Sequence, residues 1–157
     1  MGNVKNNTMR NIKTFESFST KIRAGLIPYI KQDGIIKMLF FIPSDPDYGG
    51  DKPQIAKGRV DKNEDVKTAA LREASEELGL VIDNVINTKL ITKELLSGMT
   101  ADNYEFHLYA SEIKDLNNFI PYGDETLETK WLTMEEFIKD GRESQVELVK
   151  KTYDAIK

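Results

Sequence analysis

The pattern of hydrophobic and polar positions predicts a core built mainly from strands. Two apolar runs, 21–30 and 34–43, are joined by Gln32-Asp33-Gly34, and an Asp-Gly pair between apolar runs is typical of a β-hairpin. A strictly alternating stretch at 104–112 predicts a strand with one apolar and one polar face. The remaining strands are expected at 53–58, 85–94 and 131–132, with polar loops at 44–52 and 95–103.

One helix is expected between Asp65 and Gly79, where apolar side chains recur at every fourth position. Asp65 is a suitable N-cap, since its side chain can accept a hydrogen bond from the first turn and its charge suits the positive end of the helix. Gly79 suits the other end, because glycine adopts the left-handed conformation without a Cβ clash. The apolar stripe is narrow and contains small side chains, which would let the helix lie close to a sheet: Val66, Ala70, Ala74 and Leu78.

Two more helices are expected toward the C-terminus. Thr133 begins the first, because Thr133 and Glu136 have the spacing of a capping box. Residues 143–157 carry apolar side chains on one helical face and are expected to pack as an amphipathic helix. The polar residues 1–19 are expected to form a leader, docked or flexible, that precedes a single domain at 20–157.

Composition argues against several classes of function. With 157 residues, of which 39% are hydrophobic and 31% charged, the chain is expected to be one soluble domain with a substantial core. A net charge of −4 argues against a general nucleic-acid or membrane surface, since binding a phosphate backbone needs clustered Lys and Arg. The chain has no Cys, which excludes disulfides and thiol catalysis and fits a cytoplasmic protein. We expect no signal peptide and no membrane-spanning segment, because no sufficiently long apolar run is present.

The chemistry is concentrated in the segment 58–80. Glu73 and Glu77 are an i,i+4 pair, and with Glu76 they lie on one side of the expected helix, beside its apolar stripe. Arg72 lies one turn before Glu76 and can pair with it. Acidic clusters on helices are commonly solvent-exposed faces. Like charges beside a buried stripe repel, however, and a divalent cation would relieve that repulsion; carboxylates without Cys, and with a single His, favour Mg²⁺ or Mn²⁺ over zinc.

The same segment resembles the Nudix box, Gly-x5-Glu-x7-Arg-Glu-U-x-Glu-Glu-x-Gly-U, where U is aliphatic. Every fixed and aliphatic position is matched: Gly58, Glu64, Arg72, Glu73, Ala74, Glu76, Glu77, Gly79 and Leu80. Such a match would arise by chance in a chain of this length on the order of once in ten million. The resemblance implies an α/β (α+β) fold, the Nudix-type α/β/α sandwich with a mixed central sheet. It also implies an enzyme that hydrolyses acid anhydrides in phosphorus-containing compounds.

The resemblance further implies a metal site made of carboxylates. Glu73, Glu76 and Glu77, with the backbone oxygen at Gly58 or just before it, are expected to bind Mg²⁺, for which Mn²⁺ can substitute. Glu64 is expected to support this cluster from the loop that precedes the helix.

Catalysis is expected to need a carboxylate that accepts a proton from the attacking water. Glu73 or the loop acid Glu125 is the candidate base, and Glu128 is the second choice for the loop acid because it adjoins the last strand. An exposed loop acid without a catalytic role is equally compatible with the sequence at either position. The residues assigned to catalysis are Glu73, Glu77, Arg72 and Glu125, with Arg72 expected to orient the acids.

Substrate contacts are expected from basic and aromatic side chains near the cleft. The candidate phosphate contacts are Arg23, Lys57 and Arg59. Tyr104, Phe106 or Tyr122 is a candidate for stacking on a base, although core packing is the default for Phe106. The single histidine, His107, has no matching Cys or Asp constellation, so we expect it to be a surface histidine or one with its hydrogen bonds satisfied.

The resemblance implies a nucleotide substrate. The entry to the box, 54–58, is similar to the Leu-Pro-Lys-Gly entry of diadenosine-tetraphosphate hydrolases and to the Gln-Phe-Pro-Gln-Gly entry of bacterial RNA pyrophosphohydrolases, with Ala56 in place of the proline of both. We therefore expect a dinucleoside polyphosphate such as diadenosine tetraphosphate. The alternatives are an RNA 5′ end, a nucleoside triphosphate or ADP-ribose, and, in another class, a non-catalytic nucleotide-binding regulator. The sequence leaves open whether the protein is a monomer or a homodimer.

Overall fold

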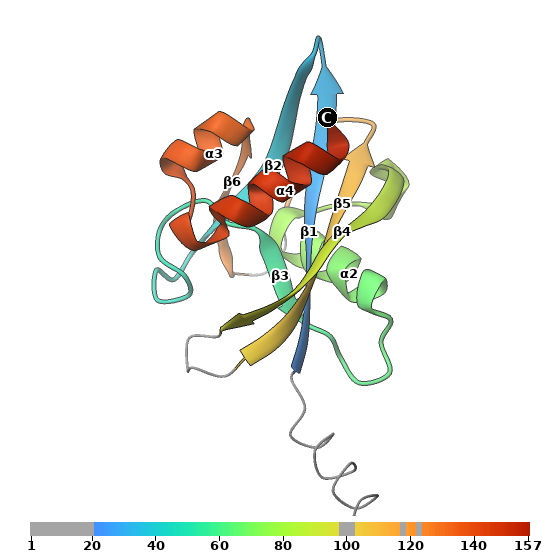
Figure 1. The fold of residues 1–157 in the computed structure, drawn as a ribbon, viewed down its shortest axis with the longest axis vertical. Coiled ribbons are helices and arrows are strands. Elements are labelled where there is room, and N and C mark those ends of the chain that lie inside the picture. The colour runs from blue at the N-terminus through green and yellow to red at the C-terminus, as the bar shows by residue number, and fades with distance from the viewer. Residues whose placement is uncertain (1–20, 98–102, 117–118, 122–123) are drawn as a thin grey trace, which may run out of the picture.

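The computed structural model describes residues 21–97, 103–116, 119–121 and 124–157 (Figure 1). The expected leader at 1–19 and the candidate stacking residue Tyr122 lie outside the described residues.

The described strands form one six-stranded mixed sheet, with the order β4-β5-β1-β2-β6 and with β3 paired to β1 off this path. β1 and β5 are parallel, whereas β1–β2, β1–β3, β2–β6 and β4–β5 are antiparallel. The strand bounds are Lys21–Gln32 for β1, Ile35–Pro43 for β2, Ala56–Arg59 for β3, Val85–Ser97 for β4, Asn103–Ile113 for β5 and Thr126–Leu132 for β6.

Helices cover both faces of this sheet, with α3 and α4 in front of it and α2 behind it in Figure 1. The α-helical bounds in the described residues are Val66–Leu78 for α2, Met134–Asp140 for α3 and Val146–Ile156 for α4; short 3-10 turns lie at Ile82–Asn84 and Glu143–Gln145. One core cluster, with Phe106 and Phe137, fills the space under α3 and α4. A second, with Leu39 and Ala70, fills the space under α2. The expected α/β/α sandwich around a mixed sheet is therefore confirmed.

The predicted hairpin between the first two strands is confirmed. Asp33 and Gly34 both have positive φ, at 54° and 80°, as a two-residue turn of type I′ requires. β1 continues to Gln32, two residues beyond its predicted end, and β2 begins at Ile35, one residue after its predicted start.

Three other strands have boundaries that differ from the predictions. β6 begins at Thr126 and not at Trp131, because its residues pair with β2, so Glu128 lies in this strand and not in the loop before it. β4 continues to Ser97 instead of ending at Glu94, because Leu95–Ser97 pair antiparallel with the start of β5. β3 begins only at Ala56, and Gln54 forms an isolated bridge to Phe41. In each of these strands the pairing partner, and not the local sequence, decides where the strand begins or ends.

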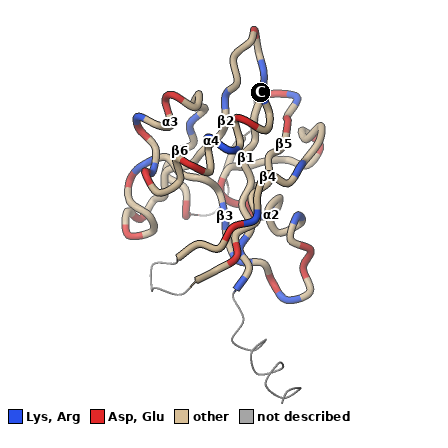
Figure 2. The backbone as a smooth tube through the Cα atoms, viewed as in Figure 1, with Lys and Arg blue, Asp and Glu red and all other residues tan. Residues whose placement is uncertain are grey.

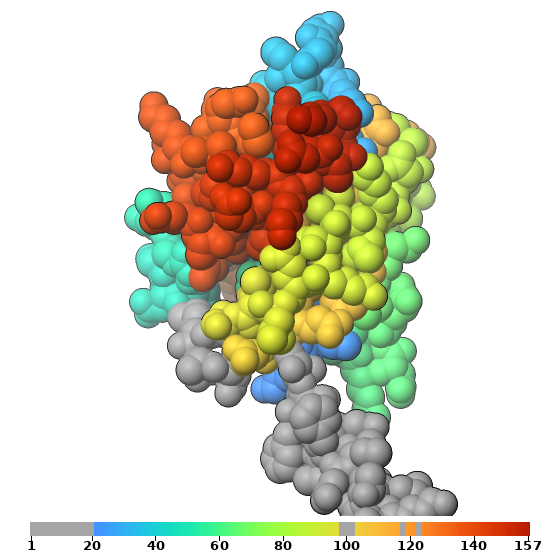
Figure 3. All heavy atoms as spheres, in the orientation of Figure 1, coloured from blue at the N-terminus to red at the C-terminus, as the bar shows by residue number. Residues whose placement is uncertain are grey.

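The C-terminal segment begins as a 3-10 turn and continues as α4, which packs beside β4. Lys89 Nζ donates to the carbonyl of Ala155 at 2.5 Å, and Lys151 pairs with Glu94. In Figure 3 the C-terminal helices and β4 form one continuous near face. None of the helices in the described part of the chain is long and apolar enough to cross a membrane. Figure 2 shows Lys and Arg interspersed with Asp and Glu over most elements, in keeping with the net charge of −4.

Candidate active site

Helix α2 has the ends that the sequence predicted. The side chain of Asp65 accepts a hydrogen bond from the Thr68 N–H at 3.1 Å. At the other end Gly79 has φ 78° and its N–H donates to the Ser75 carbonyl at 3.0 Å. The stripe of small residues is buried, with Ala70 and Ala74 fully covered. These small side chains let α2 lie close to the sheet, which places the acidic side of the helix beside β3.

Arg72 is the centre of a network that ties α2 to the preceding loop. Its guanidinium makes a two-point contact with Glu64, with Nε–Oε2 at 2.9 Å and Nη2–Oε1 at 3.1 Å. The same side chain donates to Glu73 at 2.9 Å and to the carbonyl of Arg59 at 2.9 Å. The expected contact with Glu76 is longer, at 3.4 Å. The hydrogen bond from Arg72 lowers the pKa of Glu64, which keeps this supporting carboxylate charged.

Glu73 lies against the backbone of Gly58. Its side chain is 12% exposed, and burial, followed by the charge of Glu76, raises its pKa. A Cβ at Gly58 would stand 2.2 to 2.4 Å from the Glu73 carboxylate atoms, closer than non-bonded atoms approach. The glycine at this box position is therefore required by the carboxylate that lies over it.

Gly58→Ala is expected to reduce Mg²⁺-dependent turnover by about 100-fold, because the added methyl group would push the Glu73 carboxylate from its position. Stability should change by less than about 1 kcal/mol, since the displaced atoms are the end of a flexible side chain. Turnover and thermal denaturation measure the two effects. Lys67→Ala, on the exposed side of α2, should change neither, and a fully active Gly58→Ala protein would contradict this account.

Glu77 is the most deeply buried acid of the cluster, at 8% exposure. Its Oε1 accepts a hydrogen bond from the Lys57 N–H at 2.9 Å. Burial raises the pKa of Glu77 to about 8, with further contributions from the charges of Glu73 and Glu125. Perturbation of this kind is typical of functional sites and unlike a solvent-exposed face of glutamates.

The two candidate loop acids occupy different surroundings. Glu125 lines the same pocket as Glu77, and its charge raises the pKa of both Glu73 and Glu77. Glu128 is half-exposed and lies 3.9 Å from Lys130. The arrangement therefore places Glu125, and not Glu128, beside the acidic cluster.

The acidic cluster has the chemistry that suits a hard divalent cation. Within the described ranges, no three His, Cys, Asp or Glu side chains already converge as ready-made ligands. Glu73 and Glu77 nevertheless each keep one carboxylate oxygen that accepts no hydrogen bond from the described residues, and their charges repel each other. Oxygen ligands with unneutralised negative charge fit Mg²⁺ or Mn²⁺, which would compensate that repulsion.

A pocket of about 560 Å³ adjoins Glu77. Arg23 and Lys57 both lie over the ring of Tyr104, with the guanidinium carbon and the Nζ at 5.2 and 5.6 Å from its centroid. The pKa of Lys57 is lowered to about 8, mainly by burial and then by the charges of Arg23 and Arg142. The predicted site residues that line this pocket are Arg23, Lys57, Glu77, Tyr104 and Glu125.

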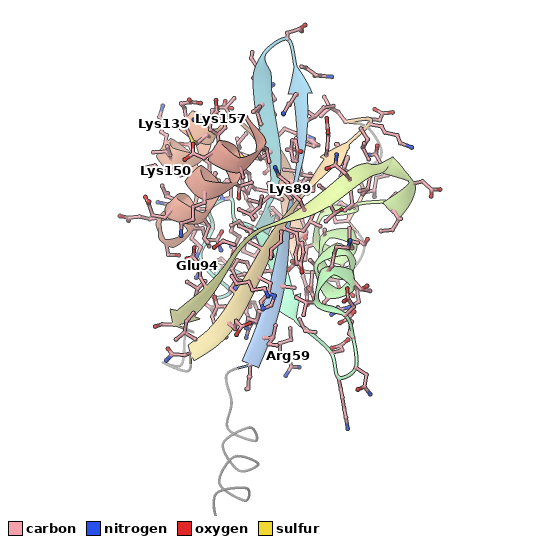
Figure 4. The ribbon with its side chains drawn as sticks, turned by 45° about the vertical axis from the view of Figure 1, so that its right-hand side comes forward. Arg59, Lys89, Glu94, Lys139, Lys150 and Lys157 are labelled. Carbon is pink, nitrogen blue, oxygen red and sulfur yellow. The ribbon has the colours of Figure 1, made fainter. Side chains whose placement is uncertain are left out.

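Other predicted residues lie elsewhere. Five of them are not among the residues that line this pocket: Gly58, Glu64, Arg72, Glu73 and Glu76. Arg72 contacts the three glutamates, and Gly58 lies against Glu73. Arg59 is exposed beside the beginning of β1 (Figure 4), and its carbonyl accepts a hydrogen bond from Arg72.

The structure tests two further predictions, one for Phe106 and one for the single histidine, His107. Phe106 is fully buried in the core, so its default role in packing is confirmed. His107 is buried, and its Nε2 lies 2.5 Å from Glu105 Oε1, so the expectation of a satisfied histidine is also confirmed.

The pocket also contains residues that the sequence did not predict, among them Tyr48, Gln54 and Arg142. Gln54 stands four residues before the box glycine, a position that could have drawn attention to it. Arg142 follows α3 by two residues and is separated from the box by more than sixty positions. No local pattern marks it as part of the site.

Comparisons with known proteins place the chain among Nudix folds. A family model described as NUDIX domain matches residues 37–152. The Ap4A hydrolase of C. elegans, solved as a binary complex, has a TM-score of 0.72 at 21% identity, over 87% of this chain and 98% of that chain. The NUDIX domain of Shewanella oneidensis NrtR, complexed with ADP ribose, has a TM-score of 0.72 at 12% identity, over 88% and 90%. A NUDIX hydrolase from Nitrosomonas europaea has a TM-score of 0.64 at 16% identity, over 87% and 90%. A search of curated proteins finds no match. At these identities, the similarity to the solved structures shows the fold alone.

Proposed function

The chain belongs to the Nudix family and is a hydrolase of acid anhydrides in phosphorus-containing compounds, and within that class we propose that it is a divalent-cation-dependent pyrophosphohydrolase of dinucleoside polyphosphates. One observation carries the proposal. The buried carboxylate of Glu77 opens onto a pocket whose walls also carry Arg23, Lys57 and Arg142. Acids that suit a cation therefore adjoin basic side chains that suit phosphate.

The box residues would hold the cation. Glu73, Glu76 and Glu77, with the backbone oxygen of Gly58, supply oxygen ligands, and Arg72 holds the Glu73 carboxylate in place through a 2.9 Å contact. When bound, Mg²⁺ supplies charge neutralisation at the phosphates and lowers the pKa of a bound water.

The other residues of the site would act on the substrate and on the water. Glu73 or Glu125 accepts a proton from the water that attacks phosphorus. Lys57 and Arg23 bind phosphate oxygens with charge-assisted hydrogen bonds. The ring of Tyr104, which lies near these two cations and lines the pocket, would stack on a base.

A substrate with two bases is favoured by a second aromatic side chain. Tyr48 lines the same pocket as Tyr104 and is 71% exposed, so its ring is accessible. The pocket volume of about 560 Å³ lies in the range of sites for nucleotide-sized ligands. A solved relative in fold is named an Ap4A hydrolase, which agrees with this choice.

The test is a substrate panel with Mg²⁺: diadenosine tetraphosphate, ADP-ribose, a nucleoside triphosphate and 5′-triphosphorylated RNA. We expect kcat/KM for diadenosine tetraphosphate to exceed the others by at least about 10-fold, because this substrate alone can use both aromatic faces and the basic wall together. Products separated by anion exchange give the position of cleavage. EDTA should abolish turnover and Mn²⁺ should restore it. Preference for ADP-ribose, or turnover that survives EDTA, would overturn the proposal.

A further inference from the structure

The turn after α3 is hydrogen-bonded to residues 53–55, the segment that leads into the box. The Arg142 N–H donates to the Pro53 carbonyl at 2.9 Å, and the Ile55 N–H donates to Gln145 Oε1 at 2.8 Å. On its other side the same segment pairs with β2, through two hydrogen bonds between Gln54 and Phe41 at 2.9 and 3.0 Å. Gln54 and Gln145 are both almost fully buried. The backbone of Arg142 is therefore held in a defined position against the pocket.

The guanidinium of Arg142 is held between this segment and the loop at 44–52. Its Nη1 donates to Gln54 Oε1 at 3.1 Å. A Cβ at Gly49 would stand 2.6 Å from Nη1, so only glycine lets the loop pass this close. Gly49 also has φ 97°, a conformation that favours glycine. The side chain is half-buried and lines the pocket.

Three basic side chains of the pocket are not neutralised by nearby carboxylates in the part of the chain that the structure describes. Among the described residues, none of Arg23, Lys57 and Arg142 forms an ion pair with a carboxylate. The guanidinium of Arg142 contacts the neutral side chain of Gln54, so a charged partner would come from a ligand. An arginine with free donors in a half-buried site is suited to planar, two-point contact with a phosphate.

Arg142 lies farther along the pocket than the acidic cluster. The Nη1 of Arg142 donates to the side chain of Gln54, whereas Glu77 Oε1 accepts a hydrogen bond from the N–H of Lys57, three residues farther along the same segment. Three residues of extended chain span about 10 Å, so the contact of Arg142 and the contact of Glu77 lie at different points along this segment. A phosphate bound by Arg142 would be one that is remote from the bond being cleaved.

We propose that Arg142 is a specificity-determining residue that binds a phosphate remote from the metal-binding carboxylates, and that it thereby favours long polyphosphate chains over simple diphosphates. This inference rests on the proposed function, because it concerns the same pocket. It adds that the site selects substrates by the length of their polyphosphate chain. A diphosphate spanning only the acids and Lys57 would not reach Arg142, whereas a tetraphosphate would.

The test compares Arg142→Met with the wild-type protein. The substitution keeps an apolar stem and leaves the backbone contact with Pro53 intact. We expect KM for diadenosine tetraphosphate to rise about 10- to 100-fold, as for loss of a charge-assisted hydrogen bond, with kcat changed less than about twofold. KM for ADP-ribose should change less than about threefold. Arg142→Lys keeps the charge but not the planar guanidinium, so its KM for diadenosine tetraphosphate should lie between those of the wild-type protein and Arg142→Met.

Lys150→Met is the matched control. It removes the same charge by the same replacement on the outer side of α4, where the Lys150 side chain is 47% exposed (Figure 4). It should leave both KM values unchanged. If Arg142→Met raises KM for ADP-ribose as much as for diadenosine tetraphosphate, the selection by chain length is wrong.

Binding of inorganic tripolyphosphate in EDTA separates this inference from the proposed function. Calorimetric titration should give a dissociation constant at least about 10-fold weaker for Arg142→Met than for wild type and for Lys150→Met. This readout needs no turnover, so it stands even if diadenosine tetraphosphate is not a substrate. Equal binding by Arg142→Met and wild type, or no binding by wild type, would overturn the role of Arg142. Thermal denaturation checks that each variant is folded. If Arg142→Met does not fold, the same titration is carried out with Arg142→Lys.

Discussion

Glu77→Gln is expected to lower kcat/KM of the Mg²⁺-dependent reaction by about 1000-fold and to leave the fold intact. The amide oxygen can still accept the hydrogen bond that the Lys57 N–H now donates to Oε1 at 2.9 Å. The negative charge is lost, however, at the most buried position of the acidic cluster, where a cation would depend on it most. Phosphate release from the preferred substrate, at several Mg²⁺ concentrations, measures the loss.

The same substitution should stabilise the metal-free protein above neutral pH. The pKa of Glu77 is raised to about 8 from an ordinary value of 4.5, so the folded state holds a proton that the unfolded state releases between these values. This contribution to stability is complete below pH 4.5 and is lost as pH rises through 8. In EDTA, as the pH rises toward and above 8, the free energy of unfolding of the wild-type protein should therefore fall relative to that of Glu77→Gln, by an amount on the order of a few kcal/mol.

Melting temperatures between pH 5 and pH 9, in EDTA and in Mg²⁺, measure this difference. Mg²⁺ should restore the wild type at pH 8 and have little effect on Glu77→Gln. Glu147→Gln makes the same chemical change at a side chain that is 79% exposed on α4, and should alter neither activity nor the pH profile. Parallel pH profiles for wild type and Glu77→Gln would show that the carboxylate is not buried as the structure has it.

Gly79→Ala is expected to reduce the free energy of unfolding by about 2 to 4 kcal/mol. Two effects combine at this position. The residue has φ 78°, which costs a Cβ-bearing residue about 1 kcal/mol. An added Cβ would also stand 2.3 Å from backbone atoms of Ile120, which cannot move aside as a side chain can. Urea denaturation at constant slope gives the change.

Gly34→Ala separates the two effects. Gly34 has φ 80°, nearly the value at Gly79, and a Cβ there would meet nothing within 4 Å. Its substitution should therefore cost only the conformational term, about 1 kcal/mol. Equal losses in the two variants would rule out the contact with Ile120 as the cause of the larger effect.

The local chemistry of the box could be predicted because its signals act over a few residues. Asp65 and Gly79 end the helix as expected, since capping depends on groups within one turn. Asp33 and Gly34 form the predicted hairpin, and Thr133 begins α3 with the predicted capping box. Short-range backbone preferences decide each of these features.

Strand ends and the far wall of the pocket could not be predicted in the same way. β4 extends through Leu95–Ser97 because β5 provides hydrogen-bond partners there, and nothing in those three residues requires it. Glu125 could not be chosen firmly over Glu128 from sequence, since both are acids near one strand. The fold places the first in the pocket and the second beside Lys130.

The sequence by itself determined the box, its helix, the acids that suit a divalent cation and membership of a hydrolase family. These depend on residue types at fixed spacing along one short segment. Only the tertiary structure decided how deeply Glu77 is buried, which basic side chains face it, and that Arg142 joins Arg23 and Lys57. The reason is physical: burial, the resulting pKa shifts and the convergence of charges depend on contacts between segments far apart in the chain, which no local pattern records.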